Sequence, residues 1–397
     1  MSDPTPHVLL VVDAEEDRRS LHDILAGEGY RLTDAKGADA LEVARDLEPC
    51  VTLVDGAGAA EVLAKLKSDP GTRDLAVIVL SAAEDAAGLL GDPRRGAADH
   101  IAKPFLPAEV IARVRSQVTI RRLERDLERR NEQLERTNRQ MRSDLEAAAE
   151  VQRSLLPRVA PDVPGVGFAW HYRPCLALAG DSLGVLPLDD RHVALYVLDV
   201  SGHGVSSALL SVAVTRSLGL KSDPAALVSV REPGEEEPRV RHPAEVASRL
   251  NDLFPMDAID NHYFTLTYGI LDPETGRFEF VSPGNPGPIL ARPGEAPRVY
   301  DRPAVPIGMF PDSDYEDATI QMAPGDRVYL HSDGLTEERN GAGEEFGRER
   351  LLAAIAAAEA LPLEKAVDAV AQASRDWRGA DACRDDVALL GFEYRGS

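Results

Sequence analysis

The stretch HVALYVLDVSGHGVSSALL, residues 192–210, decides the fold of the larger part of this chain. Its apolar and β-branched run over 192–200 predicts a buried strand. The strand ends around Asp199, and a turn rich in glycine and serine leads into a helical pattern that begins at Val205. An acid that closes a buried strand lies at the edge of a sheet, where it can meet the ends of other strands.

Further acidic residues border apolar runs in the same region. Asp181 lies in AGDS, Asp333 follows VYLHS, and the pair Asp385 and Asp386 precedes VALLGF. Four acidic strand ends on one domain would repel one another unless a cation lay among them. Mg²⁺ and Mn²⁺ prefer such oxygen ligands. Glycines beside these acids let the backbone come close to a metal or a substrate: Gly180, Gly202 and Gly334.

Around these acids, short strand patterns alternate with turns. Strands are predicted at 263–272, 277–283, 326–334 and 385–394, and helical patterns at 205–220, 243–254 and 349–377. We expect an α+β domain over 157–397, with antiparallel sheets and helices packed outside. Residues 221–242, which carry Pro, Gly and a run of Glu, are interpreted as a mobile surface loop.

This segment resembles the metal-dependent type 2C (PPM) protein phosphatases, in their bacterial RsbU/SpoIIE-type branch. The resemblance rests on EVQRSLLP (150–157), AGDS (179–182), LDVSGHGVSSALL (198–210), RLNDLF (249–254), 263–290, PIGMF (306–310), 329–351 and RDDVALLGF (384–392). It implies a β-sandwich flanked by helices that holds two Mn²⁺ or Mg²⁺ ions. The implied metal ligands are Asp181, Asp199, Asp333, Asp385 and the backbone carbonyl of Val200, and the four aspartates are the implied catalytic residues. Asp199 would bridge both metals, and Asp386 is the less certain member of its pair because neighbours on a strand point opposite ways.

The resemblance also implies a reaction and a partner. The enzyme would hydrolyse a phosphoserine or phosphothreonine on a partner protein, through a water that bridges the two metals. Relatives of this type act on an anti-anti-sigma factor of the STAS fold, which is therefore the expected substrate. His203 is a candidate proton donor to the leaving oxygen, with an exposed turn residue as the other interpretation. His331 is expected to be structural.

Several positions depart from the family pattern. AGDSLG stands where the family has GGDFYD, so that Gly184 replaces an acid; PGNPG stands for AGHPP, with Asn285 in place of His; and DDVA stands for DDIT. These changes leave the matched metal ligands in place. The alternative is a catalytically weak pseudophosphatase that serves as a dimeric scaffold or binding module.

The first 118 residues follow a different pattern. Apolar runs at 7–13, 50–55 and 75–81, with a fourth segment at 99–105, alternate with helical patterns. This alternation predicts a parallel sheet covered by helices on both faces. The functional groups of such sheets gather at the carboxyl ends of the strands, where Asp13, Asp55, Ser81 and Lys103 lie.

This segment resembles a response-regulator receiver domain, a flavodoxin-like doubly wound α/β fold. The resemblance implies that Asp55 is the phosphoacceptor, with Ser81 and Lys103 beside the phosphoryl group, and a histidine kinase as a partner. Receivers pair acids after the first strand to hold Mg²⁺, whereas here Ala14 follows Asp13, and the loop after Asp55 is short. A receiver with its own Mg²⁺ and a pseudo-receiver that needs no phosphate therefore both stay open.

The two segments are joined by a charged stretch without glycine or proline from 108 to 156. Apolar residues at seven-residue spacing predict a coiled-coil linker helix over 119–156, with these residues at position d: Ile120, Leu127, Leu134, Met141, Ala148 and Leu155. Position a then holds Asn131, Asn138, Leu145 and Gln152. Asparagines at position a are typical of parallel two-stranded coils, so a homodimer is expected, with a single solvated helix as the other interpretation.

Composition limits the remaining classes. The net charge of −23 disfavours nucleic acid and anionic membrane as partners. The sequence contains no basic recognition-helix pattern, which argues against a transcription factor. No apolar run is long enough for a membrane span, so we expect a cytoplasmic protein. Cys50, Cys175 and Cys383 are far apart in the sequence, which suggests neither a disulfide framework nor a zinc site.

Overall fold

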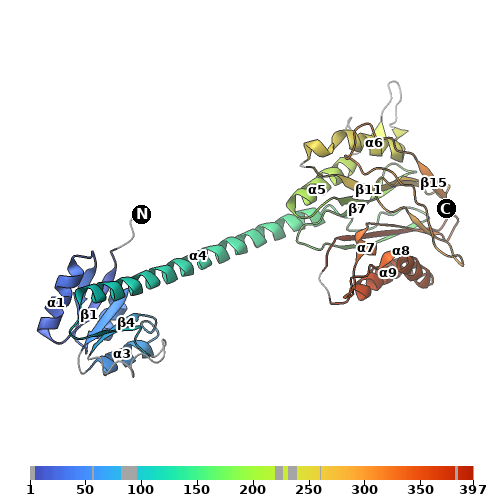
Figure 1. Cartoon of the computed structure of the whole chain (residues 1–397). Helices are drawn as coiled ribbons and strands as arrows, with labels where there is room; N and C mark the ends of the chain where they lie inside the picture. Colours follow the sequence, from blue (N-terminus) through green and yellow to red (C-terminus); the bar gives the residue numbers. More distant parts are fainter. Residues whose placement is uncertain are drawn as a thin grey trace. The chain divides into compact units, whose positions relative to one another are not determined.

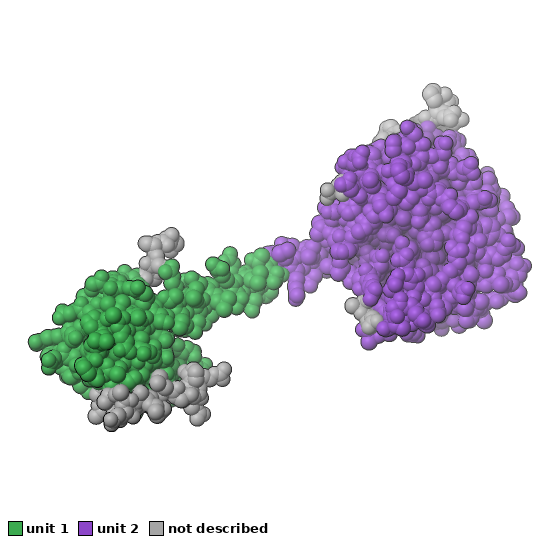
Figure 2. Space-filling model, in the orientation of Figure 1, with its two compact units in different colours: residues 1–139 green, residues 140–397 purple. Residues whose placement is uncertain are grey.

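The computed structural model describes residues 5–55, 58–81, 96–219, 227–230, 239–259, 261–380 and 383–396. The chain divides into two compact units, residues 1–139 and 140–397 (Figure 2). Most of the expected surface loop 221–242 lies outside the described residues, as do residues 56 and 57 in the loop after Asp55. Two described pieces of 221–242 pair as the short strands β9 (Ser229–Val230) and β10 (Arg239–Val240).

The first unit is built on a five-stranded parallel sheet (Figure 1). Its strands are β1 (His7–Val11), β2 (Arg31–Asp34), β3 (Val51–Asp55), β4 (Ala76–Ser81) and β5 (Asp99–Ala102). The spatial order is β2-β1-β3-β4-β5, and every neighbouring pair is parallel. This is the strand order of flavodoxin-like doubly wound folds, as the resemblance to receivers predicts.

Helices cover both faces of this sheet because successive strand residues point to opposite sides. Val8 and Leu10 of β1 pack with α1 (Glu15–Ala26) and the start of α4 (Pro107–Arg153). Leu9 and Val11 pack on the other side with α2 (Ala40–Leu47) and α3 (Ala59–Ser68). Burial on both faces explains why β1, β3 and β4 are continuous apolar runs.

Helix α4 is a single element of 47 residues that begins at Pro107, well before the start of the linker predicted over 119–156, and ends at Arg153. Proline suits the first turn of a helix because its missing N–H has no partner there. Many apolar side chains of α4 are exposed: Ile120, Leu123, Leu127, Leu134, Met141 and Val151. Across the described residues, no helix combines the length and apolar character needed to span a bilayer.

The heptad assignment fails at the end of α4. Gln152, expected at a position facing a partner helix, is buried instead against its own unit, and so is Ala149. Ala149 packs with Leu178 and Ala208. A buried amide finds its hydrogen bonds in the nearest backbone, here that of Ala179, so the seven-residue seam cannot continue through this turn.

The second unit contains two five-stranded sheets with antiparallel pairing (Figure 1). One has the order β15-β12-β11-β8-β7 and the other β14-β13-β16-β17-β6. The bounds in the first sheet are β7 (Ser182–Pro187), β8 (Val193–Val200), β11 (Phe264–Asp272), β12 (Arg277–Val281) and β15 (Ala318–Gln321). Those in the second are β6 (Val166–Arg173), β13 (Ile289–Ala291), β14 (Arg298–Val299), β16 (Arg327–His331) and β17 (Val387–Tyr394).

The two sheets pack face to face, and helices cover their outer faces. Val197 and Phe280 of the first sheet meet Leu330 and Phe392 of the second in one core. The outer face of the first sheet lies under α5 (Val205–Gly219) and α6 (Pro243–Leu253). That of the second lies under α8 (Gly347–Ala357) and α9 (Leu363–Arg378), which divide the 349–377 pattern at Pro362. Two short helices complete this unit: α7 (Gly334–Glu337) and the 3₁₀ turn Met256–Ala258.

Candidate metal centre

The four aspartates come from both sheets of the second unit. Asp181 immediately precedes β7 and Asp199 is the penultimate residue of β8, and these two strands are hydrogen-bonded neighbours. Asp333 follows β16 as the N-cap residue of α7, and Asp385 comes two residues before β17. The strands β16 and β17 are also neighbours. The sandwich therefore brings four separate strand ends together at one edge.

The pKa values show how closely these carboxylates interact. Burial raises the pKa of Asp199 to about 7, and the charges of Asp333 and Asp385 add to the increase. Burial likewise raises the pKa of Asp333 to about 6, together with Glu337 and Asp385. The pKa of Asp181, which is fully buried, is raised well above its usual range by burial and by Asp199. Such crowding of like charge is what a bound cation would relieve.

Individual contacts hold Asp181 in place. The Ser332 hydroxyl donates a hydrogen bond to one carboxylate oxygen of Asp181 at 2.6 Å. The Tyr172 hydroxyl donates to the backbone carbonyl of Asp181 at 3.1 Å. Ser332 also accepts the backbone N–H of Ala388, so a single hydroxyl ties the Asp181 side chain to the start of β17.

Two glycines allow the strand ends to approach. A Cβ at Gly180 would lie 2.9 Å from the Val200 carbonyl oxygen, and one at Gly334 would lie 2.0 Å from the Asp386 carbonyl oxygen. Only glycine fits at such distances without movement of the backbone. Val200, the implied carbonyl ligand, thus lies directly beside the loop that carries Asp181.

Asp385 and Asp386 have different surroundings, as their alternation on an extended chain predicts. Both carboxylate oxygens of Asp386 accept backbone N–H groups, from Cys175 at 2.7 Å and Gly180 at 2.8 Å. Asp386 therefore holds the loop before Asp181, whereas the Asp385 carboxylate accepts only the neighbouring Asp386 N–H among the hydrogen bonds of the described residues. Asp385 is the member of the pair that is free to face a cation.

The donor set fits a divalent metal. Asp181, Asp199, Asp333 and Asp385 offer hard oxygen ligands, with the Val200 carbonyl beside them, and this chemistry suits Mg²⁺ or Mn²⁺. A tighter cluster lies elsewhere in the described ranges. His242, Glu279 and Asp317 have ligand atoms that all lie within 4.8 Å of one another.

That trio has a structural explanation. An Asp317 oxygen accepts the Ala244 N–H at 2.7 Å in the first turn of α6. Glu279 pairs with Arg277 at 3.1 Å and with His242 at 3.3 Å. Asp317 thus caps the first turn of α6, and the pair of His242 with Glu279 joins the start of α6 to β12.

The two histidines of interest lie in contrasting places. His203 is exposed, and its proximity to Asp385 acts against the burial that raises the pKa of that aspartate. His331 is buried, and its Nδ1 lies 2.8 Å from the Ser332 carbonyl oxygen. Burial lowers the pKa of His331, which keeps the ring neutral and suits a structural role.

Neighbouring side chains account for two departures from the family pattern. A Cβ at Gly184 would lie 2.3 Å from the ring of Tyr196, which is buried and fills the space that an acidic side chain would need. Asn285 is also buried, and its amide donates to Thr267 at 2.8 Å and to the His331 carbonyl at 3.1 Å. Asn285 thus links the two sheets.

Sequence reasoning missed that two cysteines remote from each other in the chain both lie beside the Asp385–Asp386 pair. The Cys175 N–H donates to the Asp386 carboxylate at 2.7 Å, and the Cys383 thiol donates to the Asp385 carbonyl at 3.0 Å. All three cysteines are free thiols in the structure, so no disulfide is formed. Burial raises the pKa of the Cys175 thiol to about 12, and the Cys383 thiol and the nearby carboxylates contribute. Spacing along the chain carries no signal for such a pair.

In the first unit, the structure pairs two of the predicted receiver residues, Asp55 and Lys103. The Lys103 ammonium lies 2.5 Å from an oxygen of Asp55, which is almost fully buried at the end of β3. Lys103 also pairs with Asp17 of α1 at 2.7 Å, an acid that sequence reasoning did not include. The Ser81 hydroxyl lies 2.9 Å from His100 Nε2. Asp13 is exposed just after β1.

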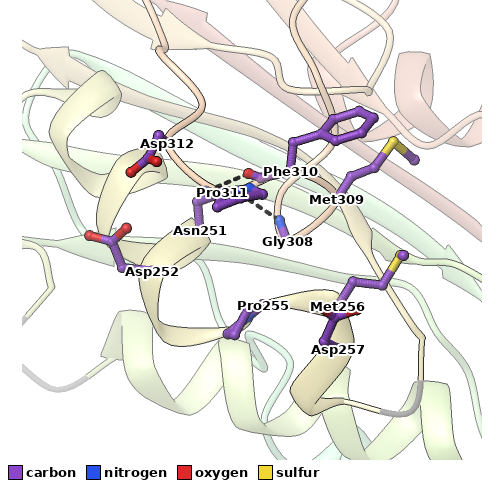
Figure 3. A pocket seen from close by; sticks show the side chains of 10 residues that line it. All are labelled: Asn251, Asp252, Pro255, Met256, Asp257, Gly308, Met309, Phe310, Pro311 and Asp312. Carbon is purple, nitrogen blue, oxygen red and sulfur yellow. Dashed lines mark hydrogen bonds between the residues drawn. The ribbon is translucent and has the colours of Figure 1, made fainter.

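A separate pocket of about 260 Å³ lies between the end of α6 and the PIGMF segment (Figure 3). Asn251 organises it: its amide oxygen accepts the Gly308 N–H at 2.8 Å, and its amide nitrogen donates to the Phe310 carbonyl at 3.0 Å. The lining includes Asp252, Asp257 and Asp312 and none of the four strand-end aspartates. The PIGMF segment, one of the stretches that carry the family resemblance, is therefore held against α6 by Asn251.

Two helix-covered antiparallel sheets with strand-end aspartates at one edge define a PPM phosphatase fold. The solved SiaA-PP2C domain of Pseudomonas aeruginosa shares this fold, with a TM-score of 0.54, 19% identity, and coverage of 65% of this chain and 98% of that one. Residues 189–395 match the family Stage II sporulation protein E (SpoIIE), and the chain belongs to this family.

Two curated relatives match different parts of the chain. Phosphoserine phosphatase RsbP of Bacillus subtilis (strain 168) is 25% identical over 199 residues, or 49% of this chain and 45% of that protein. DNA-binding response regulator MtrA of Mycobacterium tuberculosis (strain CDC 1551) is 32% identical over 116 residues, or 28% of this chain and 50% of that protein. The chain thus spans about half the length of these curated relatives. The receiver-like and phosphatase-like regions each have their own relatives.

Proposed function

We propose that this chain is a metal-dependent protein serine/threonine phosphatase that removes the phosphoryl group from a phosphoserine or phosphothreonine of a partner protein. The observation that carries the proposal is the convergence of four aspartates from two sheets, with raised pKa values for Asp199 and Asp333. Membership of the SpoIIE family and the likeness to a phosphoserine phosphatase support it. A phosphorylated anti-anti-sigma factor of the STAS fold is the proposed substrate.

The residues have distinct proposed roles. Asp181, Asp199, Asp333 and Asp385, with the Val200 carbonyl, would hold two Mn²⁺ or Mg²⁺ ions. When bound, such ions supply an activated water and neutralise charge on the phosphoryl oxygens. Asp386 keeps the loop before Asp181 in place through the N–H groups of Cys175 and Gly180. His203 is exposed near Asp385, where it can approach the leaving oxygen of a protein substrate.

The first experiment measures hydrolysis of p-nitrophenyl phosphate with Mn²⁺ by the wild type and by Asp199→Asn. Loss of a direct ligand should cost more than the roughly 10–100-fold typical of a group behind the ligand, so we expect a drop of more than about 100-fold. Asp252→Asn, which removes an exposed charge away from the centre, is the matched control. Wild-type activity no higher than that of Asp199→Asn would instead favour the pseudophosphatase scaffold.

We further propose that the N-terminal receiver controls this activity through α4. Asp55 and Lys103 are paired as a phosphoacceptor and its neighbouring cation would be, and a histidine kinase is the proposed donor of the phosphoryl group. The test compares beryllofluoride binding to the wild type and to Asp55→Ala in the full chain. Binding by the wild type alone would support a working receiver, whereas equal binding or none would favour a pseudo-receiver.

A further inference from the structure

The loop between β8 and α5 passes beside the candidate metal centre. It follows Val200, whose carbonyl is a proposed ligand, and it contains Gly202 at a φ of 83° and Gly204 at a φ of 99°. Glycine has the widest backbone freedom of any residue, and these two positions use the left-handed region that favours it. The loop can therefore keep one shape only if contacts from other segments fix its peptide groups.

Hydrogen bonds to Tyr263, which immediately precedes β11, aim the Val200 carbonyl. The Ser201 N–H donates to the Tyr263 carbonyl at 2.9 Å, and the Tyr263 N–H donates to the Ser201 hydroxyl at 3.0 Å. In a trans peptide, a carbonyl and the N–H that follows it point in opposite directions. The first of these bonds therefore turns the Val200 carbonyl away from Tyr263. That oxygen faces Gly180, where a Cβ would lie 2.9 Å from it.

His262 fixes the next peptide group of this loop with its side chain. Its Nδ1 lies 2.7 Å from the Ser201 carbonyl oxygen. Because a carbonyl can only accept a hydrogen bond, Nδ1 carries the proton and is the donor. The ring is half-buried and lies against Gly202, where a Cβ would be 3.5 Å from His262 Cε1. His262 thus holds the turn that separates Val200 from His203.

We propose that His262 is a positioning residue for the metal centre, because its Nδ1–H holds the loop that presents the Val200 carbonyl. Without this donor the Ser201 carbonyl is released, and the peptide that carries the Val200 carbonyl is held by Tyr263 alone. Groups that orient a ligand contribute to metal affinity, so we expect the affinity for Mn²⁺ to fall. The role of the Val200 carbonyl as a ligand rests on the proposed function, whereas the hydrogen bond from His262 does not.

The test compares Mn²⁺ affinity, measured by calorimetry on the full chain, between the wild type and three variants of His262. His262→Asn places an amide N–H where Nδ1 lies, His262→Gln places one where Nε2 lies, and His262→Ala places none. We expect His262→Gln and His262→Ala to bind Mn²⁺ at least about tenfold more weakly, and His262→Asn to stay close to the wild type. Equal affinity in all four proteins, or a loss in His262→Asn as large as in His262→Gln, would overturn the proposal.

His192→Ala is the matched control, because it removes a histidine hydrogen bond, to Asp189 at 2.9 Å, in the turn at the opposite end of β8. Its Mn²⁺ affinity should stay at the wild-type value, and a loss as large as that of His262→Gln would overturn the proposal. His262→Asn and His262→Gln should melt at similar temperatures with a chelator present, so that their difference in affinity reports the position of the amide and not the fold.

Hydrolysis of p-nitrophenyl phosphate by the same proteins separates the two proposals. At limiting Mn²⁺, the rate should fall in His262→Gln and be restored in His262→Asn, in parallel with the affinities. A wild type that binds Mn²⁺ without hydrolysis would fault the proposed phosphatase function instead, and the comparison of affinities would still decide the role of His262.

Discussion

At the scale of single residues, the four strand-end aspartates are costly to ionise together without a cation. Burial already disfavours the charged form of Asp199, and Asp333 and Asp385 place like charges nearby. Asp181 is relieved in part by the Ser332 hydroxyl, which donates to its carboxylate. Since protein folds do not collect unpaired buried charge without compensation, the electrostatics favour a cation site over a structural cluster.

This electrostatic cost predicts that the metal-free chain loses stability as the pH rises. The pKa of Asp199 is about 7 in the folded state, against an ordinary value of 3.8. Between these values the folded state binds more protons than the unfolded state, so the free energy of unfolding falls from about pH 4 to about pH 7. We expect the melting temperature of the second unit to be several degrees lower at pH 8 than at pH 5, measured with a chelator present.

Asp199→Asn is the control for this pH effect. The amide mimics the neutral carboxyl group permanently, so the variant should show a weaker fall between pH 5 and pH 8. Adding Mn²⁺ at pH 8 should raise the melting temperature of the wild type more than that of the variant. Parallel melting curves for the two proteins at all pH values would contradict the expectation that Asp199 titrates in this range.

The strand-end acids could be predicted because each borders a buried apolar run, which is a local signal. The Lys103–Asp17 pair could not be predicted, since it depends on which segments the fold brings together. The same holds for Asp386: its two backbone partners, Cys175 and Gly180, lie on a loop more than two hundred residues earlier.

At the scale of elements, the last turns of α4 belong to the phosphatase-like unit. The Gln152 amide donates to the Ala179 carbonyl at 2.6 Å and accepts the Ala179 N–H at 3.1 Å. Ala179 lies two residues before Asp181, so the helix holds the loop that carries a proposed ligand. This contact offers a physical route by which a shift of α4 could alter the metal centre, as the proposed control requires.

Gln152→Ala should therefore weaken both the fold and the metal centre. The change leaves the buried N–H and C=O of Ala179 without partners, at a cost of about 1–3 kcal/mol for each group. We expect a lower melting temperature and a several-fold lower Mn²⁺ affinity, measured by calorimetry on the full chain. Gln140→Ala, on an exposed part of the same helix, is the matched control. If the two variants behave alike, the Gln152 contact does not position the loop.

The strength of a local pattern decides which elements the sequence reveals. Buried strands such as β3 and β8 are clear, mostly apolar runs. The edge strand β2, with the sequence RLTD, is short and only partly buried, so it was not predicted. The heptad pattern of α4 extends past the point where the helix meets the loop at Ala179, because a periodic pattern cannot show which surface an apolar or amide side chain contacts.

At the scale of the whole molecule, α4 predicts a homodimer. Leu127, Leu134 and Met141 follow one another at seven-residue spacing, and each is more than half exposed on α4. Such a stripe is costly in water, and a second copy of the helix would cover it. Asn131 and Asn138, at position a of the same heptads, would favour two parallel strands.

Light scattering on the full chain at tens of micromolar should therefore report a dimer. The double variant Leu127→Glu and Leu134→Glu should be monomeric because four carboxylates would face one another across the seam. Arg129→Glu with Arg136→Glu adds the same number of carboxylates at positions that face away from the seam, and this variant should remain dimeric. A monomeric wild type would contradict the coiled-coil interpretation. If the arginine variant also became monomeric, the loss of the dimer would be due to the added negative charge and not to the loss of the leucine stripe.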